Sequence, residues 1–314
     1  MLCELGVIAK DRCDYPTAEQ YFQRAVTIAE PCQSEPDENI QQLCVRAWSD
    51  LGRLQRIQNR YEQARQTCEQ VLGYAEQKFG MESPEVADAL NNLGMPGKFA
   101  GWFDEARGHY DGALAILEKN HGSDPVQAAS LYHNLGGLEH ARERCAAGEP
   151  YARKSVELRL RGCGDENHPL VASDLAALAA LLDGQEKYDE AEKVYIRVIE
   201  IFTQLYGSEH YEIAVNLNNL AAICAARGDS AQAETLYRCA LTIKEKIFAP
   251  DNVEIAMTLH NLAVLYKAEE RYAKAAPMFA RALEIFTARL EPEHPHVVAY
   301  LKNYEELRRL SGLG

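Results

Sequence analysis

The chain has 314 residues, of which 47% are hydrophobic and 25% are charged, a composition typical of folded proteins and unlike that of disordered ones. Its formal net charge of −14 argues against general nucleic-acid binding, which requires a basic surface. No apolar run is long enough to span a bilayer, and the first residues lack the basic leader of a signal peptide. We therefore expect a cytoplasmic protein without a nucleic-acid or membrane partner.

The nine cysteines contain no Cys-x-x-Cys pair and keep no fixed spacing to histidine. An odd number of cysteines in a chain without an export signal indicates free thiols in a reducing compartment. We expect them to act as small hydrophobic side chains, and we expect no bound metal.

A leucine followed by a small residue recurs along the whole chain at intervals of 42 to 46 residues. Thirteen residues after the leucine stands an alanine in six copies and Gly148 in the fourth. Four residues further on, five of the seven copies have an aromatic residue, whereas the second has Cys68 and the fourth has Ala152. The leucines are Leu5, Leu51, Leu93, Leu135, Leu178, Leu220 and Leu262.

Each copy predicts one helical hairpin, because the leucine, its small neighbour and an apolar residue four positions later share one helix face. Prolines at 84, 169 and 295 are placed as the first residues of helices. Glycines at 80, 122, 164 and 207 fit helix C-termini. A single hairpin cannot bury its apolar face, so the hairpins must stack into a continuous core.

These columns resemble the tetratricopeptide repeat, and the 42-residue spacing resembles its kinesin-light-chain subtype. The closest matches are Asn91-Asn92-Leu93-Gly94, Asn218-Asn219-Leu220-Ala221, Tyr188-Asp189-Glu190-Ala191-Glu192 and Arg281-Ala282-Leu283-Glu284-Ile285. The resemblance implies an all-α, right-handed superhelical solenoid of about seven helix-turn-helix repeats with a C-terminal capping helix. No heptad coiled coil accompanies the repeats, so we do not expect a kinesin light chain itself.

The prediction is one array over residues 1–314. Its repeats are expected near residues 1–32, 38–80, 83–122, 125–163, 168–206, 210–248 and 252–290, with a capping helix over 295–311.

Two repeats depart from the pattern. Pro96 lies inside a first helix and removes the backbone hydrogen bond to Asn92, so we expect a kink or an early stop there, either as a hinge or as sequence drift. The repeat that carries Gly148, Ala152 and Ser155 has the poorest small and aromatic columns. We expect the weakest packing beside these two hairpins.

No catalytic constellation is present. Gly94 to Lys98 lacks the glycine spacing and the Ser/Thr of a phosphate-binding loop, and neither Gly-x-Ser-x-Gly nor His-Glu-x-x-His occurs. The pair His294 and His296 resembles a metal site, but a His-Pro before a first helix is a start signal in the resembled family. We expect neither enzymatic activity nor a cofactor.

The resemblance implies that first helices line a concave groove. At 100° per residue, positions two before, two after and five after each leucine face that groove. The front of the groove is then basic, with acidic residues kept to the outside apart from Asp88, and the rear is smooth and nearly uncharged. The candidate ligand-binding residues are Arg46, Arg53, Arg56, Asn91, Lys98, His133, His140, Asn218, His260 and Lys267.

Two interpretations of this basic front remain open: a groove for an extended acidic peptide, with arginines binding carboxylates, or an ordinary helix surface that favours long basic side chains. A column of asparagines precedes the leucines and is expected to tie neighbouring repeats together, although it could also hold a ligand backbone. These asparagines are Asn92, Asn134, Asn219, Asn261 and Asn303.

The favoured function is a protein-protein interaction scaffold or adaptor that binds a peptide or a partner segment. The alternative is a sensor or regulatory repeat segment of a larger signalling or transcription regulator, which the abrupt start at Met1 keeps open. The sequence leaves the partner and the oligomeric state undetermined.

Overall fold

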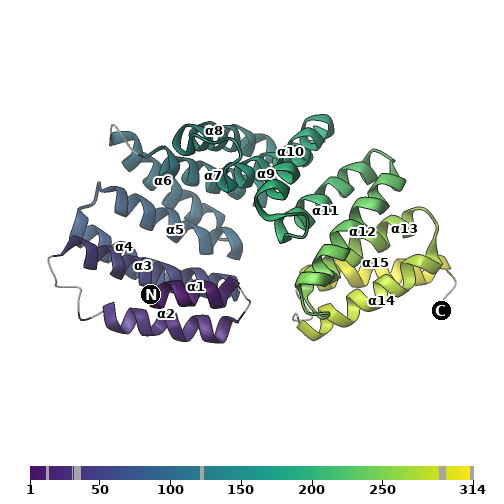
Figure 1. The fold of residues 1–314 in the computed structure, drawn as a ribbon, viewed down its shortest axis with the longest axis horizontal. Helices are drawn as coiled ribbons and strands as arrows, with labels where there is room; N and C mark the ends of the chain where they lie inside the picture. The colour runs from purple at the N-terminus through teal and green to yellow at the C-terminus, as the bar shows by residue number, and fades with distance from the viewer. Residues whose placement is uncertain (12–13, 30, 32–36, 121–123, 290–294, 312–314) are drawn as a thin grey trace. The chain divides into compact units, whose positions relative to one another are not determined.

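Figure 1 shows the computed structural model, which describes residues 1–11, 14–29, 31, 37–120, 124–289 and 295–311. Over these residues the chain forms fifteen α-helices and no strand, as the sequence predicts. None of these helices combines the length and the apolar composition needed to cross a membrane. The helices are α1 (Leu2–Asp11), α2 (Tyr15–Ala29), α3 (Glu38–Ile57), α4 (Tyr61–Phe79), α5 (Pro84–Ala100), α6 (Phe103–Lys119), α7 (Pro125–Ala141), α8 (Cys145–Cys163), α9 (Pro169–Asp183), α10 (Tyr188–Tyr206), α11 (Tyr211–Ala226), α12 (Ser230–Ile247), α13 (Val253–Ala268), α14 (Tyr272–Arg289) and α15 (Pro295–Ser311).

The helices group into two compact units. Unit 1, Met1–Gly164, holds the four helix pairs from α1/α2 to α7/α8. Unit 2, Asp165–Gly314, holds three pairs from α9/α10 to α13/α14, followed by the single helix α15. Within each unit a pair also packs against the first helix of the next pair, as expected for stacked hairpins.

Local sequence signals set the helix ends. The prolines at 84, 169 and 295 each begin a helix, as predicted, and Pro125 begins another. Side chains cap the starts: the Ser83 hydroxyl accepts from the Val86 amide at 3.3 Å, and the Asp124 carboxylate accepts from the Val126 amide at 2.9 Å. Glycines 80, 164 and 207 follow the ends of α4, α8 and α10, whereas Gly122 and His294 lie outside the described residues.

The turns inside the second to the seventh hairpin share one conformation. The residue eight positions after the leucine has a φ between 57° and 84° in every hairpin after the first. Two of these residues are glycines, which adopt positive φ freely, and the other four carry a side chain that makes it costly. They are Asn59, Gly101, Glu143, Glu186, Gly228 and Glu270.

The repeated columns form the core. The leucines from Leu51 to Leu262 are at most 9% exposed, and the alanines of the second helices are fully buried. Leu5 is 38% exposed, because no described helix covers the side of α1 that a preceding hairpin covers elsewhere.

The hairpin with the poorest columns is packed in a different way. A Cβ atom on Gly136 of α7 would lie 3.4 Å from the Gly148 carbonyl oxygen and from the Ala152 amide of α8. The two helices therefore approach closely where the aromatic residue is missing. The buried Ser155 hydroxyl also donates to the Ala129 carbonyl at 2.9 Å. Close packing of small residues and this hydrogen bond thus take the place of the contacts that an aromatic side chain makes in other hairpins.

The expected early stop at Pro96 does not occur. Helix α5 continues through Pro96 to Ala100 and ends at Gly101, whose φ is 84°. Proline removes one amide donor, but here the neighbouring helix supplies a replacement, since the Cys68 thiol of α4 lies 3.7 Å from the Asn92 carbonyl oxygen.

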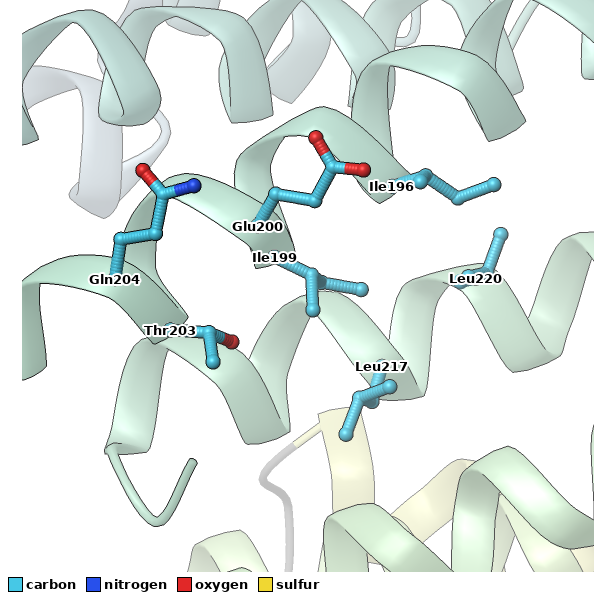
Figure 2. A pocket seen from close by; sticks show the side chains of 7 residues that line it. All are labelled: Ile196, Ile199, Glu200, Thr203, Gln204, Leu217 and Leu220. Atoms are coloured by element: carbon cyan, nitrogen blue, oxygen red, sulfur yellow. The ribbon is translucent and has the colours of Figure 1, made fainter. Parts of the chain in front are cut away.

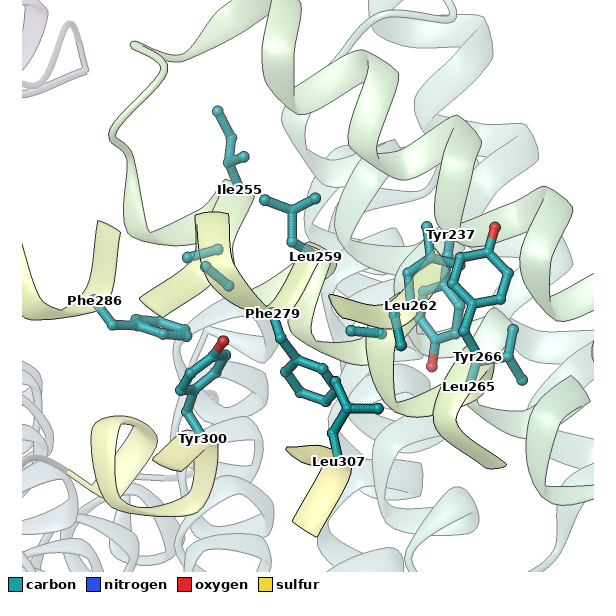
Figure 3. Packing of buried hydrophobic residues seen from close by; sticks show 14 of the residues in the cluster. Tyr237, Ile255, Leu259, Leu262, Leu265, Tyr266, Phe279, Phe286, Tyr300 and Leu307 are labelled. Carbon is teal, nitrogen blue, oxygen red and sulfur yellow. The ribbon is translucent and has the colours of Figure 1, made fainter. Parts of the chain in front are cut away.

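Helix α15 caps unit 2, as predicted. Figure 3 shows Tyr300 and Leu307 of α15 packed against Phe279 and Phe286 of α14. The Tyr300 ring lies 5.5 Å from that of Phe279 and 5.8 Å from that of Phe286, within the range of favourable aromatic pairs.

Candidate functional site

Two first helices of unit 1, α3 and α5, enclose a small pocket of about 60 Å³. Arg53 and Arg56 line it from α3, Met95 and Pro96 line it from α5, and the Cys68 thiol adds to its wall. Burial raises the pKa of Cys68 to about 12, so this thiol stays neutral. The pocket is thus lined by polar and apolar groups together, with two arginines among them.

Beside the pocket, Arg56 and Lys98 form what we call the cation pair. The Arg56 guanidinium carbon lies 4.8 Å, and the Lys98 ammonium nitrogen 4.9 Å, from the centre of the Phe99 ring. Among the described residues, neither side chain has a carboxylate within 4 Å. Phe99 itself is 49% exposed, whereas Arg56 and Lys98 are partly buried.

The two positive charges of the cation pair repel each other. The pKa of Lys98 is lowered to about 8, mainly because the side chain is buried and secondly because of the positive charge of Arg56. The pKa of Arg56 is lowered from its ordinary value, mainly because the side chain is buried and secondly because of the positive charge of Arg53. A lowered pKa on a cation means that its surroundings neither solvate nor neutralise the charged form well. A bound anion would stabilise the charged forms of both side chains.

The side chain of Lys98 reaches over the next first helix. A Cβ atom on Gly137 of α7 would lie 3.2 Å from the Lys98 ammonium nitrogen. The absence of a side chain at Gly137 therefore makes room for this cation.

A carboxylate also lies in this surface. Asp50 of α3 is only 7% exposed and lies 3.8 Å from Arg46 on one side and 3.8 Å from Arg53 on the other. The expectation that acidic residues stay outside this surface is therefore wrong at Asp50. The sequence does contain a signal for an inward-facing polar residue here, because Asp50, like Asn92, stands one residue before a repeat leucine.

Asparagine side chains connect successive first helices. The Asn134 amide donates to the side-chain oxygen of Asn91 at 2.9 Å, and the Asn261 amide donates to that of Asn218 at 3.3 Å. These bonds agree with the expected role of the asparagine column in tying repeats together. They also orient Asn91 and Asn218, because each amide oxygen is engaged.

The remaining candidates lie on α7 and α13. In unit 2, Lys267 donates to Glu306 at 2.5 Å and to Asn303 at 2.9 Å, so its charge is neutralised within the chain. The His260 ring packs against Phe279 and Tyr300 at 5.7 and 5.5 Å. In unit 1, His133 is partly buried, and His140 is exposed in the last turn of α7.

A larger hollow of about 440 Å³ lies in unit 2 between α10 and α11 (Figure 2). Ile196, Ile199, Leu217 and Leu220 face the hollow. Specific ligand sites combine an apolar surface with a few converging polar groups, whereas this open hollow offers Glu200 as its charged group. The α3–α5 surface is smaller but carries both charged and polar side chains.

Models of the family described as "Tetratricopeptide repeat" match residues 127–199, 174–246 and 254–312, and a further such model matches residues 45–78. Together the matches cover more than half of the chain. The matched models describe a repeat scaffold and not an enzyme family.

One curated relative, a clustered mitochondria protein homolog from Coccidioides immitis, is 27% identical over 165 residues, which are 52% of this chain and 13% of the relative. The chain thus matches a small part of a much longer protein. A putative kinesin light chain from Podosopora anserina with nearly identical repeats has a TM-score of 0.56 at 19% identity, covering 65% of this chain and 96% of that one. A Rap protein complexed with Competence and Sporulation Factor has a TM-score of 0.67 at 16% identity, covering 98% and 80%.

Proposed function

Because this chain belongs to the tetratricopeptide repeat family, we propose that it is a protein-binding module that holds an acidic peptide segment against Arg56 and Lys98. The observation that carries the proposal is the cation pair. It is partly buried, lies beside an exposed aromatic ring, and has no carboxylate within 4 Å among the described residues.

The energetics favour an anionic ligand. Most arginines of this chain lie within 4 Å of a carboxylate, as Arg65, Arg107 and Arg227 do. Arg56 and Lys98 instead repel each other, and a ligand carboxylate between them replaces that repulsion by attraction. A charge-assisted hydrogen bond in such a setting contributes roughly 1–3 kcal/mol.

Neighbouring groups suit a peptide. The Asn91 amide, oriented by Asn134, can donate to a backbone carbonyl of the ligand. The exposed Phe99 ring offers an apolar contact next to the charges. The surface therefore combines a carboxylate site, a backbone donor and an aromatic anchor.

The test is a titration of labelled acidic, neutral and basic peptides against wild type, Arg56→Glu and Lys193→Glu. Lys193 is an exposed residue of α10 in unit 2, so its reversal changes the net charge equally without altering the α3–α5 surface of unit 1. We expect preferential binding of acidic peptides that weakens with salt, and a loss of at least about tenfold in Arg56→Glu alone. Equal losses in both variants, or a preference for basic peptides, would refute the proposal.

A second proposal, that the chain is a regulatory repeat segment of a larger protein, has separate support. The segment that matches the curated relative is only 13% of that relative's length. Identification of the open reading frame around this sequence tests it, and a neighbouring effector domain would support it.

A further inference from the structure

Asp50 is an acidic residue of α3 that lies beside two of the candidate arginines, so its charge opposes the proposed ligand. Its position, one residue before the helix leucine, is an asparagine in four other hairpins. In two of them this asparagine donates to the preceding hairpin, from Asn134 to Asn91 and from Asn261 to Asn218. A carboxylate cannot donate, so Asp50 does not make this bond.

Within the described part of the chain, no group donates a hydrogen bond to Asp50. Its Oδ2 atom is buried and has no hydrogen-bond donor, and its two ion-pair distances, to Arg46 and Arg53, are both 3.8 Å. Contacts of that length are ion pairs without hydrogen bonds. Burial raises the pKa of Asp50, and the charges of Arg53, Arg46 and Lys10 lower it.

The two arginines are half exposed, at 50% for Arg46 and 52% for Arg53, so solvent and ligands can reach them. They share a single carboxylate, whereas Arg56 and Lys98 have none. The anion-binding capacity of the surface is therefore uneven along α3: reduced around Asp50, and undiminished six residues further on at Arg56.

We propose that Asp50 is a specificity-determining residue of this surface. Its carboxylate offsets the charge of Arg46 and Arg53 and so confines ligand carboxylates to Arg56 and Lys98. At the end of the surface near Asp50, it favours a ligand residue that is neutral or donates a hydrogen bond. The inference rests on the proposed function and names the ligand class more closely: a segment with one acidic site followed by an uncharged one.

The experiment compares two labelled peptides of equal length, one with a single acidic residue and one with two acidic residues at neighbouring positions, beside an uncharged peptide. Three variants are titrated with wild type. Asp50→Asn installs the residue found at this position elsewhere, Asn92→Asp places a carboxylate at the equivalent position beside Arg56, and Glu62→Gln removes one negative charge from the exposed surface of α4.

We expect Asp50→Asn to bind the two-acid peptide at least about fivefold more tightly and the one-acid peptide less than about twofold more tightly. Glu62→Gln should change neither, and Asn92→Asp should weaken both. Equal gains for both peptides in Asp50→Asn would mean that only net charge matters, and no gain would mean that Asp50 merely holds the arginines in place. Either result overturns the inference. If neither acidic peptide binds wild type better than the uncharged one, the proposed function itself fails.

Discussion

The Cys68 thiol lies 3.7 Å from the carbonyl oxygen of Asn92, which is the acceptor that Pro96 leaves without a backbone donor. Two departures from the repeat pattern thus compensate each other. Cys68 stands where most repeats have an aromatic residue, and Pro96 stands inside a helix. The smaller side chain brings a weak donor to the carbonyl that needs one.

This pairing predicts a coupling between the two positions. Cys68→Ala should lower the free energy of unfolding by roughly 1–3 kcal/mol, because it leaves a cavity and a buried carbonyl without a donor. In a Pro96→Ala background the loss should be smaller, since the restored amide then donates to Asn92. Urea denaturation of the four proteins of this double-mutant cycle measures the coupling. Additive losses would show that the thiol contact contributes nothing.

The hairpin turns predict a stabilising substitution. Glu186 has a φ of 60°, which costs a side-chain-bearing residue about 1 kcal/mol or more relative to glycine. Glu186→Gly should therefore raise the free energy of unfolding by up to about 1 kcal/mol, although the more flexible unfolded chain offsets part of the gain. Gly228→Ala, at the equivalent turn, should lower it by a similar amount.

The matched control for these turn variants is Lys193→Gly, in the interior of α10, which should destabilise by about 1 kcal/mol. Thermal and urea denaturation give the comparison. A loss of stability in Glu186→Gly would mean that its side chain makes contacts that outweigh the backbone cost.

Replacing the repeat leucines by alanine should lower the free energy of unfolding by different amounts at different positions. Leu135 is fully buried between hairpins, so Leu135→Ala should cost about 2–5 kcal/mol. Leu5 is 38% exposed, and Leu5→Ala should cost less than about 1 kcal/mol. The measurement is the urea midpoint of each variant. A large cost at Leu5 would indicate that another segment or a second molecule covers α1 in solution.

The lowered pKa of Lys98 predicts a pH dependence of binding. A lysine with a pKa of about 8 is charged at pH 7 and mostly neutral at pH 9, so affinity for an acidic peptide should fall as the pH rises through this range. The bound carboxylate raises the pKa in the complex, which moves the loss toward higher pH.

The control for this pH dependence is Lys98→Arg, because arginine stays protonated throughout. Peptide titrations between pH 6.5 and 9.5 should show up to about a tenfold loss for wild type and a flat profile for the variant. A flat wild-type profile would exclude Lys98 from the site.

The sequence alone was sufficient for the helices, the register of the repeats and their buried columns. Leu93 and Ala106 could be assigned to the core because helical periodicity and side-chain volume act within one hairpin. The prolines that begin α5 and α9 are equally local signals. The basic character of α3 was also visible in the sequence.

The partners of the polar side chains were decided only by the tertiary structure. The sequence could not show that Lys267 meets Glu306, that Asp50 lies between two arginines, or that Cys68 donates to Asn92. Such pairs lie on different helices or depend on small rotations of one helix. A change of one or two ångströms in hairpin stacking makes or breaks a hydrogen bond but leaves a buried leucine buried, because hydrophobic burial is non-directional and hydrogen bonding is not.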